Sequence, residues 1–503
     1  GSIDDPEIVS AREPLFAERG GFYYEHWDEL YTAWMVRIRD LLGRLDAITF
    51  PDLPEVVPAE EVLAGRGVGR AYDLSRRYHD VLDLGVELWQ NHFELLNLGY
   101  AAYLDYFEFC RQLLPQFSDL QIARTVAGID VDLFRPDREL RRLARAAVEL
   151  GVDEVLCDGP LAAVLASLIG QPGGEEWLAD FTRTQQPWFN FSTGSGFYHD
   201  DAVWADHLEY PLGFIRSYIG QLRAGHCIES PTQQVAVDRD RLAHEARAAL
   251  AGADLERFDE KLQLARTVFH FVENHNFYVE HWGMSLLWRK LREFSSLFVK
   301  EGFWSAADDI FYLRPSEVEE SMWDMLGSWA NGTPACGPQR WPHEIRRREA
   351  IIAACSASCP PPTLGVMPLA VTEPFTIMLW GITSDSVNGW QKGPSGATEL
   401  RGLAVSAGLV TGRARVVLSP DHLDEVEEGE ILVTELTSPS WAPVFGRIAG
   451  TVTETGGMMS HVAIVCREYG LPAVTGVSRA TQCIRTGQLL QVDGSTGIVT
   501  ILG

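Results

Sequence analysis

The sequence predicts a multi-domain protein, α and α/β in class, with a large, mainly helical domain followed by a compact α/β domain. The chain has 503 residues, which is more than one hydrophobic core usually organises. Apolar residues recur at three- and four-residue spacing through residues 1–354, and this spacing is typical of helices. From Glu399 onward, short β-branched runs alternate with turn residues, which indicates strands.

The helical part is interrupted by one stretch of different character. Residues 28–45, 70–114 and 138–150 carry the helical period, with Gly and Pro clusters between such segments. Residues 187–211, PWFNFSTGSGFYHDDAVWADHLEYP, are instead aromatic, polar and glycine-containing. A loop of this length inside a helical domain is often functional. The alternative is a long surface excursion that buries its aromatic residues.

A linker is predicted between the two domains, over residues 355–398. Its first half is rich in Ala, Ser, Cys and Pro, and its second half is polar with several glycines, which suits a semi-rigid connection. Residues 399–503 then form the α/β domain, with one helix at about 460–469. Strands are expected at 414–418, 430–434, 450–453, 489–492 and 498–502.

Composition excludes several classes of partner. The net charge is -28, and no basic stripe stands out, so we expect neither nucleic acid nor membrane as a partner. No run of about 18 apolar residues suggests a transmembrane helix, and no signal peptide is visible. The cysteines are scattered, and only Cys355 and Cys359 lie close together. We therefore expect no metal site and a reduced, cytoplasmic protein.

The stretch TETGGMMSHVAIVCREYGLPAVTG, residues 453–476, places a histidine at a predicted helix start. Gly456 and Gly457 allow the backbone to turn sharply or to approach a ligand closely. His461 falls in the first helical turn, where free N–H groups and the positive end of the helix dipole favour an anion. A neutral imidazole there is suited to accept a phosphoryl group, and Ser460 adds a hydroxyl donor.

Two other interpretations of His461 are open. A lone histidine is more often a packed or surface residue than a catalytic one. A metal ligand is less well supported, because position 465, one helical turn later, is Val and offers no second ligand.

The same residues carry a family resemblance. The C-terminal domain looks like the phosphohistidine, or swivelling, domain of the phosphoenolpyruvate-utilising enzymes, although Ala407 stands where proline is usual. The resemblance implies that His461 carries phosphate, bound with the help of Gly456, Gly457 and Ser460. The matching blocks are AVSAGLVTGRA at 404–414, GEILV at 429–433, TSPSWAPVF at 437–445, GMMSHVAIVCR at 457–467 and DGSTGIV at 493–499.

Other parts of these enzymes are not recognisable. The chain ends directly after the closing hairpin, so the barrel that binds phosphoenolpyruvate or pyruvate is not expected. No GxxxxGK[ST] motif is present, and GRGVG at 65–69 is too weak to stand alone. The resemblance therefore implies that a separate ATP-grasp subunit binds ATP and Mg²⁺, or that an ATP-binding domain was removed. This chain alone is expected to bind no cofactor.

One predicted helix, residues 262–301, suggests an acceptor pocket. At 100° per residue, four of its polar or aromatic side chains fall within about 40° of one direction. They are His270, Asn274, His281 and Trp288. Either histidine of that set could act as general base, and the alternative is a core helix with satisfied histidines. A second stripe contains His275, Trp282 and Arg289, and Arg289 could offset phosphoryl charge.

The aromatic stretch at 187–211 would cover this pocket with Trp188, Phe189 and Tyr198. Residues 302–320, GFWSAADDIFYLRPSEVEE, resemble the end of the substrate-binding helical domain in rifampicin phosphotransferase-like proteins. The arrangement as a whole is most similar to the transfer subunits of phenylphosphate synthases and to the hydroxyphenylethanone kinases.

That resemblance implies the reaction ATP + phenol + H₂O → aryl phosphate + AMP + phosphate. Residues 1–354 would bind the small phenolic substrate, and the swivelling domain, 399–503, would deliver the phosphoryl group. Two alternatives are open: a phosphotransferase acting on another hydroxyl, such as that of an antibiotic, and a phosphocarrier or regulatory protein without acceptor chemistry. A phenol needs a small closed cavity, whereas a larger acceptor needs a wide groove.

Overall fold

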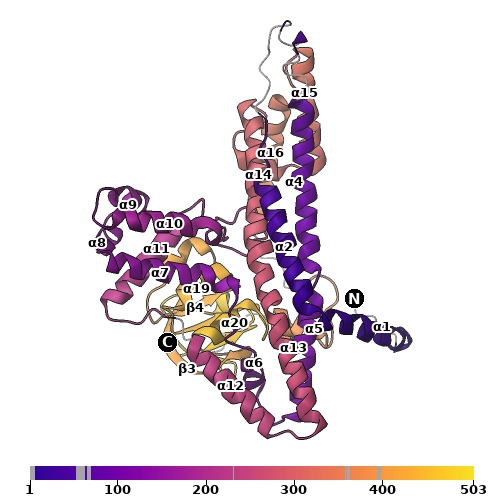
Figure 1. The fold of residues 1–503 in the computed structure, drawn as a ribbon, viewed down its shortest axis with the longest axis vertical. Helices are drawn as coiled ribbons and strands as arrows, with labels where there is room; N and C mark the ends of the chain where they lie inside the picture. Colours follow the sequence, from indigo (N-terminus) through magenta and orange to yellow (C-terminus); the bar gives the residue numbers. More distant parts are fainter. Residues whose placement is uncertain are drawn as a thin grey trace. The chain divides into compact units, whose positions relative to one another are not determined.

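The computed structural model describes residues 6–51, 60, 63–64, 70–229, 232–356, 358, 363–392 and 398–503, drawn in Figure 1. Two compact units make up the chain. Unit 1 combines residues 1–32, 95–277 and 364–503, and unit 2 combines residues 33–94 and 278–363. GRGVG at 65–69 and Cys359 lie outside the described residues. The predicted class, a helical domain followed by an α/β domain, is confirmed.

Unit 2 is built from long helices. Their core stacks Phe294 on Tyr78, with ring centroids 4.7 Å apart, and Trp304 on Phe298 at 4.7 Å. Its elements are α4 (Arg70–Phe93), α14 (Met284–Lys300), η3 (Ala307–Tyr312), α15 (Pro315–Asn331) and α16 (Gly337–Ser356), together with most of α2 (Trp27–Asp46).

The helix predicted over 262–301 is helical without a break from residue 262 to residue 300, but its middle part is a π-helix, so the α-helical period assumed for the whole length is wrong. Helix α13 (Ala253–His275) passes into a π-helical segment, η2 (Asn276–Gly283), before α14 begins. A π-helix bonds residue i to i+5 and therefore turns by a smaller angle per residue than an α-helix. A helical wheel drawn at 100° per residue therefore holds for His270 and Asn274, which lie before the π-helical segment. It does not give the directions of His281 and Trp288 relative to them.

Unit 1 contains the remaining helices. In one group, α5 (Leu96–Leu113) runs beside α13, and Gly99 permits the close approach, because a Cβ atom there would lie 2.8 Å from Val272 Cγ2. α6 (Asp119–Arg124) and α12 (Thr232–Ala248) lie nearby, and α1 (Pro6–Glu25) begins the chain. The second group is α7 (Arg135–Glu149), α8 (Asp153–Cys157), α9 (Leu161–Ser167), α10 (Gly174–Trp188) and α11 (Glu209–Arg223).

The α/β part of unit 1 has one eight-stranded sheet, in the order β1-β8-β7-β3-β4-β5-β6-β2. Strands β3, β4, β5 and β6 are parallel, and the remaining pairs are antiparallel. Val433, Val452 and Val474 are fully buried in its core. The strands are β1 (Glu399–Arg401), β2 (Leu403–Ser406), β3 (Leu409–Val416), β4 (Ile431–Thr434), β5 (Gly450–Thr453), β6 (Ala473–Thr475), β7 (Leu489–Asp493) and β8 (Ile498–Ile501).

Short helices accompany this sheet. α20 (His461–Tyr469) follows β5, and α19 (Ala442–Phe445) and α21 (Ala480–Cys483) cover other turns, with the 3₁₀ segments η4 (Pro420–Glu425) and η5 (Pro439–Trp441). Within the predicted linker, α17 (Pro374–Trp380) and α18 (Ser384–Lys392) are helical. In the described ranges, no helix is both long and apolar enough to span a membrane.

Candidate functional site

His461 is the first residue of α20, as the sequence predicts. Ser460 is the extended residue before the helix, and Gly470 ends it with a left-handed backbone, φ 67°. The backbone N–H groups of His461, Val462 and Ala463 meet no acceptor in the described part of the chain. Because these are the free donors of a first helical turn, the positive end of the helix dipole lies at His461.

The two ring nitrogens of His461 are closed to solvent. The residue as a whole is half-buried, but both ring nitrogens are inaccessible and have no hydrogen-bond partner among the described residues. The ring lies 6.4 Å from the ring of Phe134, between centroids. Burial lowers the pKa of His461 to about 3, so the side chain is a neutral imidazole at physiological pH.

The glycine loop before His461 is hydrogen-bonded to the backbone of α17. The N–H groups of Gly456 and Gly457 donate to the carbonyl oxygens of Trp380 and Leu379, each at 2.9 Å. Met459 N–H donates to Met378 O at 2.8 Å. The two glycine amides predicted to bind phosphate are therefore already used, and the free donors are those of the first helical turn.

Ser460, the third residue predicted to bind phosphate, is also engaged. Its hydroxyl donates to the carbonyl oxygen of Gly457 at 2.7 Å, which folds the loop back on itself. The structure thus brings Gly456, Gly457, Ser460 and His461 together, with only His461 presenting unpaired polar side-chain atoms.

The α/β domain and the helical part of unit 1 contact each other through α20. Glu468 accepts a hydrogen bond from Gly128 N–H at 2.5 Å. Tyr469 donates to Asp137 at 2.7 Å and accepts from Arg141 at 3.1 Å. The buried end of the histidine helix is therefore joined to the helical part by polar contacts as well as by packing.

The aromatic stretch at 187–211 forms a second contact with the α/β domain. The hydroxyl of Ser440 and the indole N–H of Trp441 both donate to Thr193 O, at 2.9 and 3.0 Å. Ser438 donates to Gly194 O. The turn after β4 therefore packs against this loop, a contact that the sequence did not predict.

The three aromatic residues predicted to cover a substrate have different environments. Trp188 is half-buried, with its ring 5.4 Å from Phe277 and the Arg135 guanidinium 5.7 Å from its centre. Phe189 is fully buried and belongs to the core. Tyr198 is 66% exposed. Trp188 is linked to the histidine site through Arg135, which contacts its ring and follows Phe134 in the chain.

Asn274 and His270 both lie in unit 1 but have different surroundings. Asn274 accepts from Asp132 N–H at 2.6 Å and donates to the hydroxyl of Tyr31 at 2.8 Å, so its amide ties α13 to two other segments. His270 lines an open hollow of about 430 Å³ together with Tyr31, Arg239 and Arg266. This hollow is polar and wide.

The remaining predicted residues belong to unit 2. His281 is fully buried in the π-helical segment. Trp288 meets Phe311 edge to face, with ring centroids 5.7 Å apart. Arg289, the next residue in the chain, is half-buried.

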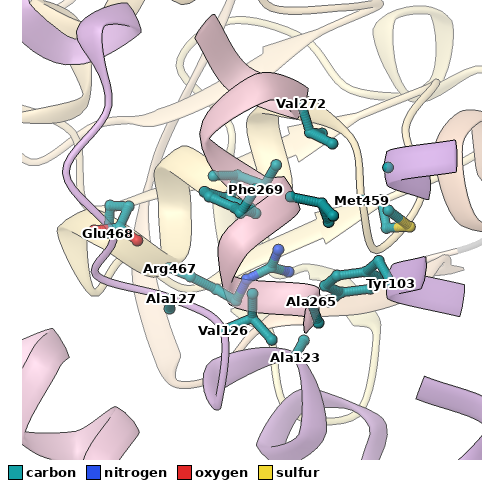
Figure 2. A pocket seen from close by; sticks show the side chains of 13 residues that line it. Tyr103, Ala123, Val126, Ala127, Ala265, Phe269, Val272, Met459, Arg467 and Glu468 are labelled. Carbon is teal, nitrogen blue, oxygen red and sulfur yellow. The ribbon is translucent and has the colours of Figure 1, made fainter. Parts of the chain in front are cut away.

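Sequence reasoning missed a buried carboxyl group and an adjacent cavity. Glu273 is 2% exposed, and burial raises its pKa to about 8, while nearby Arg467 acts in the opposite direction. The mostly apolar cavity lies between α5, α6, α13 and α20, and Figure 2 shows the Arg467 guanidinium among Phe269, Tyr103 and Val126. The only sequence signal was a glutamate one residue after the apolar pair Phe271-Val272.

Comparisons with known proteins agree with the site. Residues 426–497 match the family of PEP-utilising enzymes, mobile domain, and this range includes His461. A rifampicin phosphotransferase of Streptomyces sp is 41% identical over 213 residues, 42% of this chain and 21% of that protein. The rifampicin phosphotransferase of Bacillus subtilis is 51% identical over 108 residues, 22% of this chain and 12% of that protein.

A further relative is similar over most of this chain. Chondramide synthase of Chondromyces crocatus is 28% identical over 429 residues, 82% of this chain and 10% of that protein. This chain therefore spans about a tenth to a fifth of the length of these three relatives.

Proposed function

We propose that this chain is a phosphotransferase in which His461 carries a phosphoryl group to an acceptor hydroxyl, because residues 426–497 match the mobile domain of PEP-utilising enzymes and the similarity to a rifampicin phosphotransferase covers 213 residues. One observation carries the proposal. Both nitrogens of His461 are buried without a partner at a helix start whose N–H groups are free. Unpaired buried polar atoms are costly, and their retention here indicates a functional role.

Two steps follow from this chemistry. In the first, a neutral ring nitrogen of His461 bonds to phosphorus as the donor's P–O bond breaks. In the second, the acceptor oxygen bonds to phosphorus, the P–N bond breaks, and a general base takes the hydroxyl proton. The free first-turn N–H groups would stabilise the anionic group on His461.

The sealed position of His461 belongs to one stage of this cycle. Its nitrogens have no access to solvent, so no phosphoryl donor reaches them from solvent while α20 is packed on the helical part, and an acceptor must bind before α20 returns. We therefore propose that the α/β domain leaves for charging and returns for transfer. The donor we propose is ATP with Mg²⁺, bound by a separate ATP-grasp subunit.

For the acceptor, the hydroxyl of an antibiotic or similar compound is better supported than a phenol. Two relatives are named rifampicin phosphotransferase. The similarity to the Streptomyces protein covers 213 residues, whereas residues 399–503 number only 105. The likeness therefore extends beyond the phosphohistidine domain. The wide hollow beside His270 also suits a larger, polar acceptor.

A small phenol is the second candidate, and one feature favours it. Phe134 lies beside His461, and Trp188 lies beside the neighbouring residue, Arg135. Aromatic walls suit a planar ring. His270, which lies in the same unit as His461, is the proposed base, and replacing it with Ala should cost roughly 10²–10⁴ in transfer rate.

The reverse reaction tests the proposal with this chain alone. Incubation with a phosphorylated acceptor, either phenyl phosphate or phosphorylated rifampicin, should place one acid-labile phosphate on the protein. Intact-mass analysis reads out the gain, and His461→Ala is the control that should show none. Phosphate that persists in this variant would exclude His461 as the carrier. The acceptor that charges the wild-type protein distinguishes the two substrate classes.

A further inference from the structure

The last residue of the histidine helix contacts a buried ion pair. Tyr469 ends α20, eight residues after His461. Its hydroxyl donates to Asp137 Oδ2 at 2.7 Å and accepts from an Arg141 amino group at 3.1 Å. Both partners lie on α7, in the helical part of unit 1.

The ion pair itself is complete without Tyr469. Arg141 Nε lies 2.7 Å from Asp137 Oδ2, and each side chain is only 4% exposed. Tyr218, on α11, donates to the other carboxylate oxygen, Asp137 Oδ1. The Arg141 guanidinium also lies over the ring of Tyr218, 4.9 Å from its centre. These partners all belong to the helical part.

We infer that Tyr469 is a positioning residue that fastens the histidine helix to the helical part and so keeps His461 in its sealed position. The assignment of that position to the transfer stage rests on the function proposed above. The fastening itself does not, because it follows from the contacts of Tyr469 alone.

The arrangement of charges makes this contact reversible. Removing one partner of a buried ion pair is strongly destabilising, because it leaves an unpaired charge. When Tyr469 departs, however, Asp137 keeps both Arg141 and Tyr218. At this contact, undocking breaks the two hydrogen bonds of the tyrosine hydroxyl and separates its ring from the Arg141 guanidinium, which lies 5.4 Å from the ring centre, but it leaves the Asp137–Arg141 ion pair intact. A contact of this kind stabilises the docked position of the α/β domain and still allows the domain to leave.

Diethyl pyrocarbonate, which modifies accessible neutral imidazoles, measures the fastening directly. Its rate at His461 reports the population in which α20 has left the helical part. Tyr469→Phe keeps the ring and removes both hydrogen bonds. We expect about a ten-fold faster modification of His461 in this variant, since hydrogen bonds to charged groups are the stronger ones.

Tyr218→Phe is the matched control. It also removes a buried hydroxyl from Asp137, but on the side that does not cross to α20. Its modification rate at His461 should stay within about two-fold of wild type. The exposed His207 gives an internal standard in the same digest, and unchanged circular dichroism shows that each variant is folded.

Two outcomes overturn the inference: equal His461 rates in wild type and Tyr469→Phe, or equal acceleration in both variants. The proposed function is tested separately on the same proteins by phosphate loading from the phosphorylated acceptor. Absence of loading in the wild type overturns the function but leaves the modification rates as a valid test of Tyr469.

Discussion

The amide of Gly457 donates to the carbonyl oxygen of Leu379 at 2.9 Å, which joins the histidine loop to a helix that lies within the predicted linker. Gly456 and Met459 form parallel bonds to Trp380 and Met378. Three successive carbonyls of the last turn of α17 are thereby satisfied by loop amides, in addition to the cap that Gly381 provides through its N–H bond to Ile377 O. We expect α17 to move with the α/β domain.

Gly457→Ala should destabilise the protein by disrupting the hydrogen bonds between the histidine loop and α17. A Cβ atom at position 457 would lie 2.2 Å from Met378 O, so α17 must shift. Forced contacts of this type cost roughly 1–3 kcal/mol. The urea midpoint should fall, and diethyl pyrocarbonate should reach His461 faster.

The matched control is Gly220→Ala, within α11, where a Cβ atom meets nothing within 4 Å. This change should be neutral or stabilising by roughly 0.5–1 kcal/mol, because alanine favours a helix. If the two variants unfold at the same urea concentration, the contact between α17 and the loop contributes nothing to stability.

Glu273→Gln should change how stability depends on pH. The folded-state pKa of Glu273 is raised to about 8 from 4.5, so the buried carboxyl is protonated where the unfolded one is ionised. Its contribution is complete below pH 4.5 and is lost as the pH rises towards 8. The free energy of unfolding of the glutamine variant should therefore exceed that of wild type increasingly across this window. Parallel curves from pH 5 to 8 would show that Glu273 ionises normally.

His461→Asn should remove a pH dependence of stability whose slope is opposite to that of Glu273. The folded pKa of His461 is lowered to about 3 from 6.5, so its contribution is complete above pH 6.5 and is lost as the pH falls towards 3. Each fully titrating group changes stability by about 1.4 kcal/mol per pH unit. Between pH 4.5 and 6.5 the two slopes oppose each other in the wild type. Removing the histidine should leave the Glu273 slope, measured by urea unfolding at several pH values.

Local sequence patterns were sufficient to place His461 at a helix start and to predict the fold class. A β-strand, a glycine turn, a helix start and the Gly470 cap all lie within about 20 residues, where turn chemistry and period determine structure. The family resemblance is confirmed by the match over residues 426–497, whereas the likeness to phenylphosphate synthase stays a prediction.

The surroundings of His461 could not be read from such patterns. Tyr469 and Asp137 are 332 positions apart, and Ser440 and Thr193 are 247 apart. Period and propensity carry no information about contacts at that range. The π-helical segment at Asn276–Gly283 also changes the phase of the helix, so a wheel that assumes one continuous α-helix cannot place His281 and Trp288 on the face of His270.

The final prediction distinguishes Trp188 from Tyr198, two aromatic residues that the sequence analysis placed together over the substrate. The ring of Trp188 lies 5.4 Å from that of Phe277 and is covered by the Arg135 guanidinium. Arg135 follows Phe134, whose ring lies beside His461. Tyr198 is 66% exposed on the same stretch. Trp188→Ala should slow transfer from phosphorylated His461 to the acceptor by roughly ten-fold, since aromatic contacts are worth about 0.5–1.5 kcal/mol beyond their buried area.

Tyr198→Ala is the control and should change the same rate by less than about two-fold, as exposed substitutions usually do. Transfer is followed as loss of the acid-labile phosphate after addition of rifampicin or phenol to the charged protein. Both variants should charge normally from the proposed ATP-grasp subunit, because neither residue lies in the α/β domain that carries His461. A larger effect at Tyr198 than at Trp188 would mean that the acceptor binds along the exposed edge of the loop, and the site beside Phe134 would then be excluded.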